Sequence, residues 1–552
     1  MMTPNLPHSV SSQTLPNRPA QHRHLPQNIC LFHAHPSHTA PLPIHRYRCR
    51  GVQSLVGWVL IVILVLTACT PALPSPTPPS VPLSPLANHR GVHPGNVAAA
   101  RAASDHAEWV SVIVTAQEMA IAEQAVIAHG GSVTSQLWII DAVGARVSAG
   151  QLAALRRAPG VVSVVNNGRI QAANNETYVD STHDPQRWRL MSPAGQLIGV
   201  DQLRATNPRL TGKHITVAVV DSGVQLDGQF PGSPVDWIAP NFIGQADFVD
   251  NATCHTAQNQ RDVDGRKDGC LQKRSQSRDP FGHGTHIAST IANHLLDDET
   301  GQRLGIAPDA NILSVRVLNE DGFGSYEQVI QGIQYVIENK KRYKIRVMNL
   351  SLVGLASTPY FVDPVNRAAQ RAWAEGIVVL AAAGNQGPWA QSITVPGNDP
   401  YLITVGAFDH SKTTLAFGDD RVATWSSTGP TLDGFIKPDV LAPGVNVVSY
   451  MHNDPADKEK AAKLVQNHPD YRAERTLYRL NGTSMSTAIA SGVVALMLQR
   501  HPELTPDEVK FRLLYTSQSA LTDTGELIDN IFQQGNGRIW APDAVLSEEI
   551  PD

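Results

Sequence analysis

The sequence lacks the charge pattern by which nucleic-acid-binding proteins are recognised. Only 17% of its 552 residues are charged and the formal net charge is −5. Between about Trp188 and Ala544 there is no basic stripe interleaved with aromatic residues, which argues against a nucleic-acid partner. Hydrophobic residues make up 42% of the chain, enough for a substantial core, and the length exceeds one ordinary domain. We therefore expect a globular protein with additional segments.

Acidic residues are absent from Met1–Arg50, which shows no hydrophobic period and is crowded with His, Pro and Arg. We expect residues 1–51 to be a disordered extension, unless translation starts downstream of them. Arginines then precede the apolar run Leu55–Leu66, which predicts a signal peptide over residues 52–69. That run is shorter than the roughly 20 residues of a membrane-spanning helix, which is the alternative interpretation.

The signal segment ends in Leu66-Thr-Ala-Cys69, which resembles the lipobox of bacterial lipoproteins. The resemblance implies that Cys69 is lipidated, becomes the mature N-terminus and holds the protein on a membrane. We therefore expect an extracytoplasmic, lipid-anchored protein of the cell envelope, or a protein secreted after processing. Residues 70–104 are rich in proline and predict an extended tether of about 3 Å per residue.

Three short segments in a fixed order carry the chemistry: Val-Val-Asp-Ser-Gly at Val219–Gly223, Gly-His-Gly-Thr-His at Gly282–His286, and Gly-Thr-Ser-Met-Ser at Gly482–Ser486. A serine hydroxyl needs an imidazole to take its proton, and the imidazole needs a carboxylate to fix its tautomer. Asp221, His283 and Ser484 are the candidates for these catalytic roles. Asp221 ends an apolar run typical of a buried parallel strand, whereas His283 and Ser484 each open a run that looks helical.

The order Asp, His, Ser and these motifs resemble the subtilisin-like serine proteases, or subtilases. The resemblance implies an α/β fold, with a parallel sheet flanked by helices, in a catalytic domain over residues 173–552. The segment Ala381–Asn385 resembles the oxyanion-hole motif of the family, with Asn385 as its donor. The chain departs from the family at Ser289, where Gly is usual, and at Ala488 and Ile489, where Pro and His are usual. A helix accommodates Ala and Ile, and no proton-transfer group is lost.

Ahead of this domain, residues 105–172 follow the order strand, helix, strand, strand, helix, strand. The expected strands are 109–114, 132–140, 145–147 and 161–165, and the helices 117–128 and 151–157, which predict a small α+β ferredoxin-like domain. Its position resembles the subtilase propeptide, which implies an inhibitor and folding partner whose end, near Asn166–Asn175, lies in the cleft. We predict self-cleavage between Asn166 and Asp184. A small domain that stays attached is the alternative.

The same resemblance implies that a peptide substrate adds as a strand between two exposed edges. One edge is near Gly322–Ser325 and the other near Leu350–Gly354. The candidate substrate-binding residues are Gly322, Gly324, Ser351 and Gly384. The small residues Ala381–Gly384 leave room for a sizeable apolar side chain before the cleaved bond.

Of the five cysteines, Cys30 and Cys49 precede the predicted cleavage and Cys69 would carry lipid. Cys254 and Cys270 remain, and in an oxidising compartment we expect them to form a disulfide. Zinc is the alternative, but two cysteines with only His255 nearby make a poor ligand set. Three aspartates of the same insert faintly resemble a calcium loop, although a solvated turn is the simpler interpretation: Asp262, Asp264 and Asp268. We therefore assign no metal and no required cofactor.

The sequence thus predicts an exported, membrane-tethered serine endopeptidase that cuts proteins or peptides through an acyl-enzyme. The alternative is a catalytically inactive subtilase that binds peptides in the envelope. A lipase or esterase fits poorly, because Ser484 does not stand in a Gly-x-Ser-x-Gly elbow.

Overall fold

The computed structural model describes residues 108–174, 194–226, 237–238, 241–250, 254, 270–296, 301, 303–410, 420–453, 461–474, 476–520 and 526–551. The predicted signal segment with Cys69, the tether and the aspartates of the suggested calcium loop lie outside these residues. Within them, no helix combines the length and the apolar character that crossing a membrane requires.

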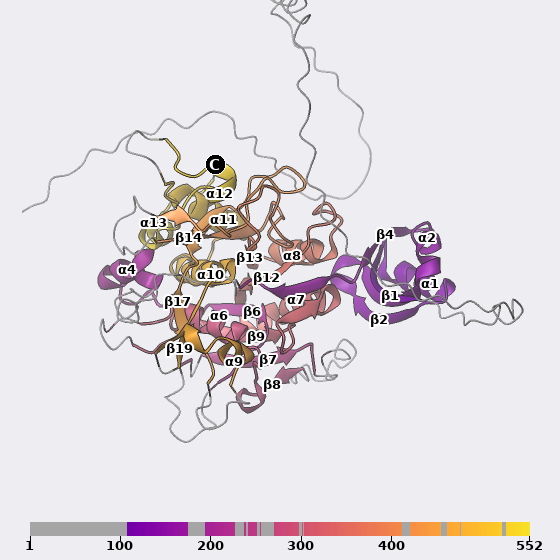
Figure 1. Ribbon diagram of the computed structural model, residues 1–552, viewed down its shortest axis with the longest axis horizontal. Coiled ribbons are helices and arrows are strands. Elements are labelled where there is room, and N and C mark those ends of the chain that lie inside the picture. The colour runs from indigo at the N-terminus through magenta and orange to yellow at the C-terminus, as the bar shows by residue number, and fades with distance from the viewer. Residues whose placement is uncertain are drawn as a thin grey trace, which may run out of the picture. The chain divides into compact units, whose positions relative to one another are not determined.

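A small domain at residues 108–166 has the order of elements that the sequence predicts (Figure 1). Its sheet has the strand order β2-β3-β1-β4, with the paired strands antiparallel. The helix α1 packs on β1, β2 and β3, and its Val126 shares an apolar core with Val112 and Val143. The elements are β1 (Trp109–Ala116), α1 (Met119–Ala128), β2 (Ser132–Leu137), β3 (Ala142–Ser148), α2 (Leu152–Leu155) and β4 (Val161–Asn166).

One strand of this domain is shorter than expected. The sequence predicts a strand to residue 140, but β2 ends at Leu137 and Trp138–Ile140 forms a 3-10 turn. Ile139 and Ile140 are buried with the large core of the rest of the chain instead of the small domain's own core. Burial of these two side chains against the larger domain therefore ends the strand early.

The larger domain is built on a mostly parallel sheet with the order β15-β14-β13-β11-β6-β9-β7-β8, and β16 pairs with β14. Among the described strands of this sheet, only β8 and β15, at the edges, run antiparallel to their neighbours. The central strand β6, with the sequence Thr-Val-Ala-Val-Val-Asp, is buried throughout, as a strand covered on both faces must be. The strands are β6 (Thr216–Asp221), β7 (Phe242–Asp247), β8 (Leu271–Gln272), β9 (Asn311–Arg316), β11 (Ile345–Leu350), β13 (Val378–Ala382), β14 (Ile403–Asp409), β15 (Arg421–Val422) and β16 (Val440–Pro443).

Helices cover both faces of this sheet (Figure 1). The helices α6 (His283–Ala292) and α10 (Thr483–Arg500) pack against each other, and α7 (Tyr326–Tyr343) packs against α8 (Pro364–Ala374). The helix α10 is buried from Thr483 to Leu498 and continues through Ala488 and Ile489 without a break, as the sequence predicts. This layered arrangement is the α/β fold expected from the motifs.

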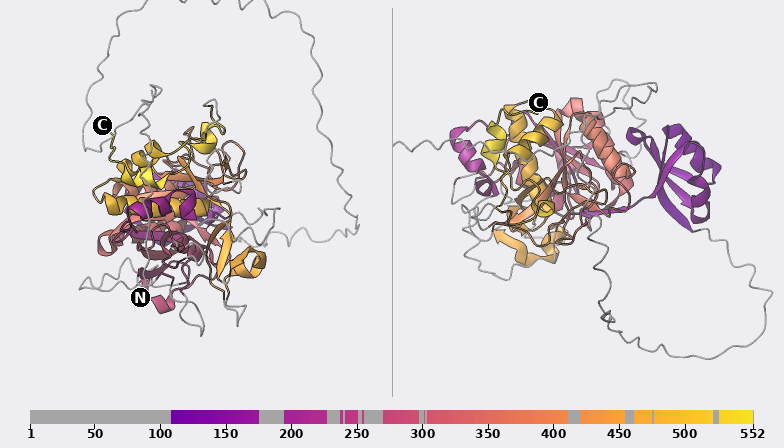
Figure 2. Two further views of the ribbon diagram at one scale, coloured as in Figure 1. Left: turned by 90° about the vertical axis from the view of Figure 1, so that its left-hand side faces the viewer. Right: turned by 90° about the horizontal axis from the view of Figure 1, so that it is seen from above.

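The remaining elements surround this core. The helix α13 packs against α10, α4 and α11, so that the C-terminal helices gather on the α10 side (Figure 2). A small sheet has the order β17-β19-β18. These elements are α3 (Ala194–Leu197), α4 (Val200–Thr206), β17 (Val447–Tyr450), α9 (Lys463–Asn467), β18 (Arg472–Glu474), β19 (Leu477–Leu480), α11 (Pro506–Thr516), α12 (Ile531–Gln534) and α13 (Ala541–Leu546).

A third sheet joins the small domain to the larger one. The strand β5 (Arg169–Ala172) follows β4 and lies between β10 (Phe323–Ser325) and β12 (Leu352–Gly354), antiparallel to both. Both edges therefore already hold a strand supplied by the chain itself.

Candidate active site

Asp221 and His283 form a buried pair at the carboxyl edge of the sheet. Asp221 is the last residue of β6, His283 is the first of α6, and neither side chain is exposed. The Nδ1 of His283 lies 2.8 Å from Oδ1 of Asp221, and the Ser222 amide donates to the same oxygen at 2.7 Å. The Nε2 of His283 has no hydrogen-bond partner among the described residues. The imidazole is thus held at one nitrogen, and the other is able to accept a proton.

A second buried carboxylate holds the start of α6. Asp279 accepts hydrogen bonds from the amides of Gly282 and Thr285, both at 2.8 Å, and from Oγ1 of Thr285 at 2.7 Å. Burial raises the pKa of Asp279, and these hydrogen bonds oppose the rise. The Ser222 hydroxyl bonds to Asp279 and accepts from the Gly284 amide at 2.9 Å. Asp279 therefore fixes the turn that presents His283, a role that the sequence motifs do not indicate because Asp279 precedes the N-cap residue of α6, Gly282.

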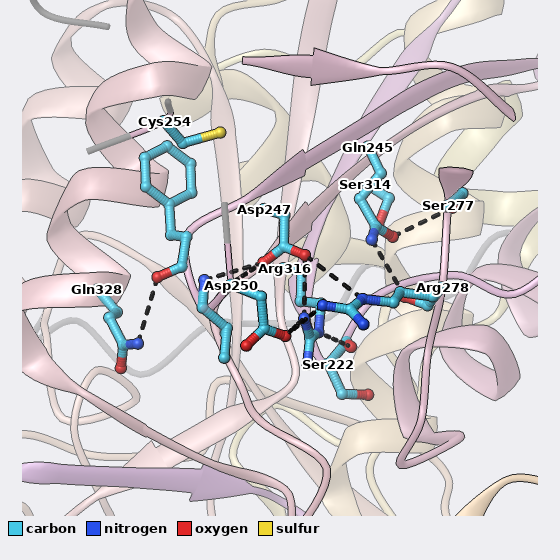
Figure 3. A network of polar contacts seen from close by, with 12 residues as sticks. Ser222, Gln245, Asp247, Asp250, Cys254, Ser277, Arg278, Ser314, Arg316 and Gln328 are labelled. Carbon is cyan, nitrogen blue, oxygen red and sulfur yellow. Dashed lines mark hydrogen bonds and ion pairs between the residues drawn. The ribbon is translucent and has the colours of Figure 1, made fainter. Parts of the chain in front are cut away.

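Arg316 supports the turn after Asp221 from the neighbouring strand. It ends β9 directly opposite Asp221, and its Nε donates to the Ser222 carbonyl at 3.2 Å. Its Nη1 binds Asp247 at 2.9 Å and also Asp250, while Arg278 binds Asp250 at 2.6 Å (Figure 3). Burial disfavours the charge, but the two carboxylates outweigh it and raise the pKa of Arg316. Sequence patterns give no signal for this network, because its members come from separate strands and loops.

Ser484 lies at the start of α10 and is fully buried. Its hydroxyl donates to the Ser351 carbonyl at 3.1 Å, and the Ser351 hydroxyl donates to the Ser484 carbonyl at 2.9 Å. Gly482, just before the helix, has φ of 154°, and a Cβ there would lie 2.4 Å from the Ala173 carbonyl oxygen. A side chain at Gly482 would therefore push Ala173, at the end of β5, away from Ser484.

The carbonyl of Ala173, the residue after β5, lies between two donors. Nδ2 of Asn385 donates to it at 2.7 Å and the Ser484 amide at 3.3 Å. The Asn385 side chain is held in turn by Thr483, whose amide and hydroxyl both donate to Oδ1 at 3.0 Å. Two fixed donors of this kind can stabilise negative charge that develops on a carbonyl oxygen.

The predicted substrate-binding residues meet around β5. Gly324 pairs with Ile170, the Gly322 carbonyl accepts from the Ala172 amide at 3.0 Å, and the Ser351 carbonyl accepts from the Ala173 amide at 3.1 Å. Gly384 lies just after β13, and its amide donates to Oγ1 of Thr483 at 3.2 Å. The structure therefore places Gly322, Gly324 and Ser351 against the segment at residues 170–173, and Gly384 against Thr483, the residue before Ser484.

Side chains of β5 alternate between the protein and the solvent. Ile170 is fully buried, and a Cβ placed on Gly354 would lie 2.7 Å from its Cδ1. The Arg169 guanidinium lies on the other face, 3.3 Å from the ring centroid of Phe323. These two contacts set the register of β5, and the sequence alone did not reveal them.

Cys254 and Cys270 form a disulfide, with their Cα atoms 4.6 Å apart and both residues buried. Cys270 immediately precedes the edge strand β8, which pairs with β7. The bond therefore ties the insert between Asp221 and His283 to the edge of the main sheet.

The chain is similar in sequence to known subtilases. A family model described as the subtilase family matches residues 212–537. Serine protease AprX of Bacillus subtilis (strain 168) is 39% identical over 296 residues, which are 52% of this chain and 58% of AprX. Subtilisin of Bacillus pumilus is 31% identical over 305 residues, 54% of this chain and 83% of that protein.

A solved structure shares the fold. Fervidolysin from Fervidobacterium pennivorans, described as a keratinolytic enzyme related to subtilisin, aligns with a TM-score of 0.58. The alignment covers 81% of this chain and 62% of fervidolysin at 22% identity, a likeness of fold. The chain thus spans less than two thirds of the lengths of AprX and fervidolysin.

Proposed function

Because the chain belongs to the subtilase family, we propose that it is a serine endopeptidase whose catalytic residues are Asp221, His283 and Ser484. The Ser484 oxygen attacks the substrate carbonyl while Nε2 of His283 takes its proton, and Asp221 stabilises the imidazolium. Collapse of the tetrahedral intermediate breaks the peptide bond, the leaving amine takes the proton from His283, and an acyl-enzyme remains. Water then attacks the acyl group with His283 again as base, which regenerates Ser484. These steps require no metal and no cofactor.

The observation that carries this proposal is the position of the Ala173 carbonyl. It accepts hydrogen bonds from Nδ2 of Asn385 and from the Ser484 amide, while the preceding residues pair with both cleft edges. That is the arrangement that a bound peptide needs for attack by Ser484. Asn385 and the Ser484 amide are therefore assigned as the oxyanion hole.

The small domain and β5 are proposed to be an inhibitory propeptide that the enzyme cuts from itself after Ala173. Ala173 falls within the window from Asn166 to Asp184 that the sequence predicts. Contacts with α7 support docking of this domain: Oγ1 of Thr134 donates to Glu327 at 2.7 Å, and the Glu327 amide donates to Asn167 at 3.0 Å. The product keeps these contacts after cleavage and so would inhibit until it is degraded.

Replacement of Ser484 tests catalysis and self-processing together. Intact-mass spectrometry of wild type should find a new N-terminus at Asn174, whereas Ser484→Ala made in the same host should stay full-length. Ser486→Ala is the matched control, because the Ser486 hydroxyl donates to carbonyls of Ala442 and Pro443, outside the catalytic contacts. Cleavage of Ser484→Ala at the same bond would contradict the proposal, since a host protease would then be responsible.

An inactive peptide-binding protein is the second candidate, because the Ser484 hydroxyl here donates to Ser351. A fluorophosphonate probe separates the two functions, since only an activated serine reacts with it. We expect the mature protein to be labelled and Ser484→Ala not to be. An unlabelled wild type freed of its small domain would favour the binding protein.

We further propose that lipid on Cys69 holds the enzyme at the cell envelope, where it cuts protein or peptide substrates. The Leu66–Cys69 motif supports this proposal. Cys69→Ala should block lipidation and move the protein from the detergent phase to the aqueous phase. Unchanged partitioning, with Leu55–Ala68 still attached, would favour a transmembrane anchor instead.

A further inference from the structure

We infer that Val353 restricts this enzyme to small side chains, such as Ala, Gly or Ser, immediately before the cleaved bond. The inference rests on the proposed protease function and names its substrate class. It departs from the expectation that the small residues Ala381–Gly384 leave room for a sizeable apolar side chain.

The backbone of Ala173 is fixed on both sides of its Cα. Its amide donates to the Ser351 carbonyl at 3.1 Å, and its carbonyl accepts from Asn385 at 2.7 Å and from Ser484 at 3.3 Å. A substrate residue that places its carbonyl at the same donors must therefore send its side chain in the direction of the Ala173 Cβ. Ala173 is 1% exposed, so that direction leads into the protein.

The Ala173 side chain is enclosed by Val353 and Ala382. These three residues form a buried apolar cluster of their own, in which Val353 is 6% exposed and Ala382 is fully buried. Val353 is the middle residue of β12, and the residues on either side of it, Leu352 and Gly354, pair with β5. A β-branched side chain on a paired strand has few rotamers and cannot swing aside for a larger group.

A segment at Thr394 and Val395 ties together the two strand ends that carry Val353 and Ala382. The Thr394 amide and hydroxyl donate to the Ala383 carbonyl at 3.0 and 3.1 Å, so Thr394 is tied to the end of β13. Val395 exchanges two hydrogen bonds with Gly354, at 2.8 and 3.0 Å, so it is tied to β12. Both residues are buried. The segment thus bridges β12 and the end of β13 and limits how far Val353 and Ala382 can move apart.

The cost of overpacking sets the expected preference in rate for a small over a large side chain before the cleaved bond. Forcing a larger side chain into a well-packed site costs typically about 1–3 kcal/mol, which corresponds to roughly 5- to 150-fold in rate. Removal of the Val353 side chain should recover most of this factor, because Val353 is the only large side chain in the enclosing cluster of Ala173, Val353 and Ala382.

The test compares two peptide anilides that keep the sequence of the chain's own cleft strand, acetyl-Ile-Gln-Ala-Ala and acetyl-Ile-Gln-Ala-Phe. We expect wild-type kcat/KM to favour the Ala substrate by about tenfold or more, and Val353→Gly to lose or reverse this preference. Val353→Thr has nearly the same shape and should keep the preference. Leu355→Gly is a second control, because Leu355 is 74% exposed.

Self-processing provides a second measurement within the precursor. Ala173→Phe should slow the appearance of mature enzyme, and Val353→Gly in the same chain should restore it. If Val353→Gly fails to fold, Val353→Ala takes its place, and hydrolysis of the Ala substrate demonstrates folding. Equal wild-type rates on Ala and Phe, or an unchanged preference in the folded glycine or alanine variant, would overturn the inference while leaving the protease function intact. Hydrolysis of neither substrate would overturn both.

Discussion

Replacing His286 with glutamine should flatten the dependence of stability on pH. His286 lies one helical turn after His283, is fully buried and places its Nε2 3.1 Å from the Tyr478 carbonyl. Burial, with a smaller contribution from the nearby His283, lowers the pKa of His286 to about 3, although hydrogen bonds to the backbone at Tyr478 and Val447 oppose the shift. The native protein therefore holds this imidazole neutral at every pH at which the enzyme is expected to work.

Proton linkage determines the direction and the size of the effect of His286 on the free energy of unfolding. An unfolded chain has a histidine pKa of about 6.5, so below that pH it binds a proton that native His286 excludes. The stability from the neutral ring is fully present above pH 6.5 and is lost as pH falls toward 3. Between pH 7 and pH 5 the loss is about 2 kcal/mol for this one group.

The measurement is urea unfolding at pH 7 and pH 5, made in the Ser484→Ala background to prevent self-digestion. The parent should lose about 2 kcal/mol more between these two pH values than His286→Gln does, even if the variant is less stable at both. His129→Gln is the matched control, because His129 is not buried, and it should keep the parent's pH dependence. Equal losses in the parent and His286→Gln would refute the reasoning.

Three further changes test other parts of the structure. Asn385→Ala should lower kcat by about 10²–10³ with little change in KM, the loss known for one oxyanion donor in a subtilisin; an unchanged kcat would remove Asn385 from the oxyanion hole. Arg316→Met should destabilise the protein by about 3–5 kcal/mol in urea unfolding, because buried Asp247 loses its ion pair at 2.9 Å and Arg278, at 3.9 Å, is a weaker partner. Adding Asp247→Asn should recover part of that loss, and no recovery would contradict the pairing. Replacing Cys254 and Cys270 by serine should cost about 2–4 kcal/mol by the same assay, and unaltered stability would show that the disulfide constrains little.

The sequence could predict the catalytic elements because each candidate residue stands at the boundary of a regular element. Asp221 ends a run of apolar, β-branched residues that only a doubly covered strand can bury, and β6 is such a strand. His283 and Ser484 begin the helices α6 and α10, as the runs that follow them indicate. Local patterns suffice where the position of a residue depends on its own element.

Contacts between distant segments could not be predicted in the same way. The strand β5 is too short for a hydrophobic period, and its register depends on pairing with β10 and β12, which lie far along the chain. A window is therefore all that the sequence predicts for the proposed self-cleavage, and the proposal of Ala173 within that window rests on its carbonyl contacts. Arg316 was missed for a related reason, since a buried arginine is explained only by the carboxylates that the fold brings to it.

Two serines are buried in the helices that carry His283 and Ser484: Ser289, one of the departures from the family pattern, in α6 and Ser491 in α10. Ser289 and Ser491 are both fully buried, where an unsatisfied hydroxyl would cost about 1–3 kcal/mol. Oγ of Ser289 accepts hydrogen bonds from the Ser449 hydroxyl at 2.7 Å and the Tyr450 amide at 3.1 Å. The Ser491 hydroxyl donates to Oδ1 of Asn349 at 3.0 Å. Each hydroxyl thus has its own partner in β17 or β11. These hydrogen bonds explain how two buried helices tolerate a serine, and because they act on stability they would be needed in an active enzyme and in an inactive peptide-binding protein alike.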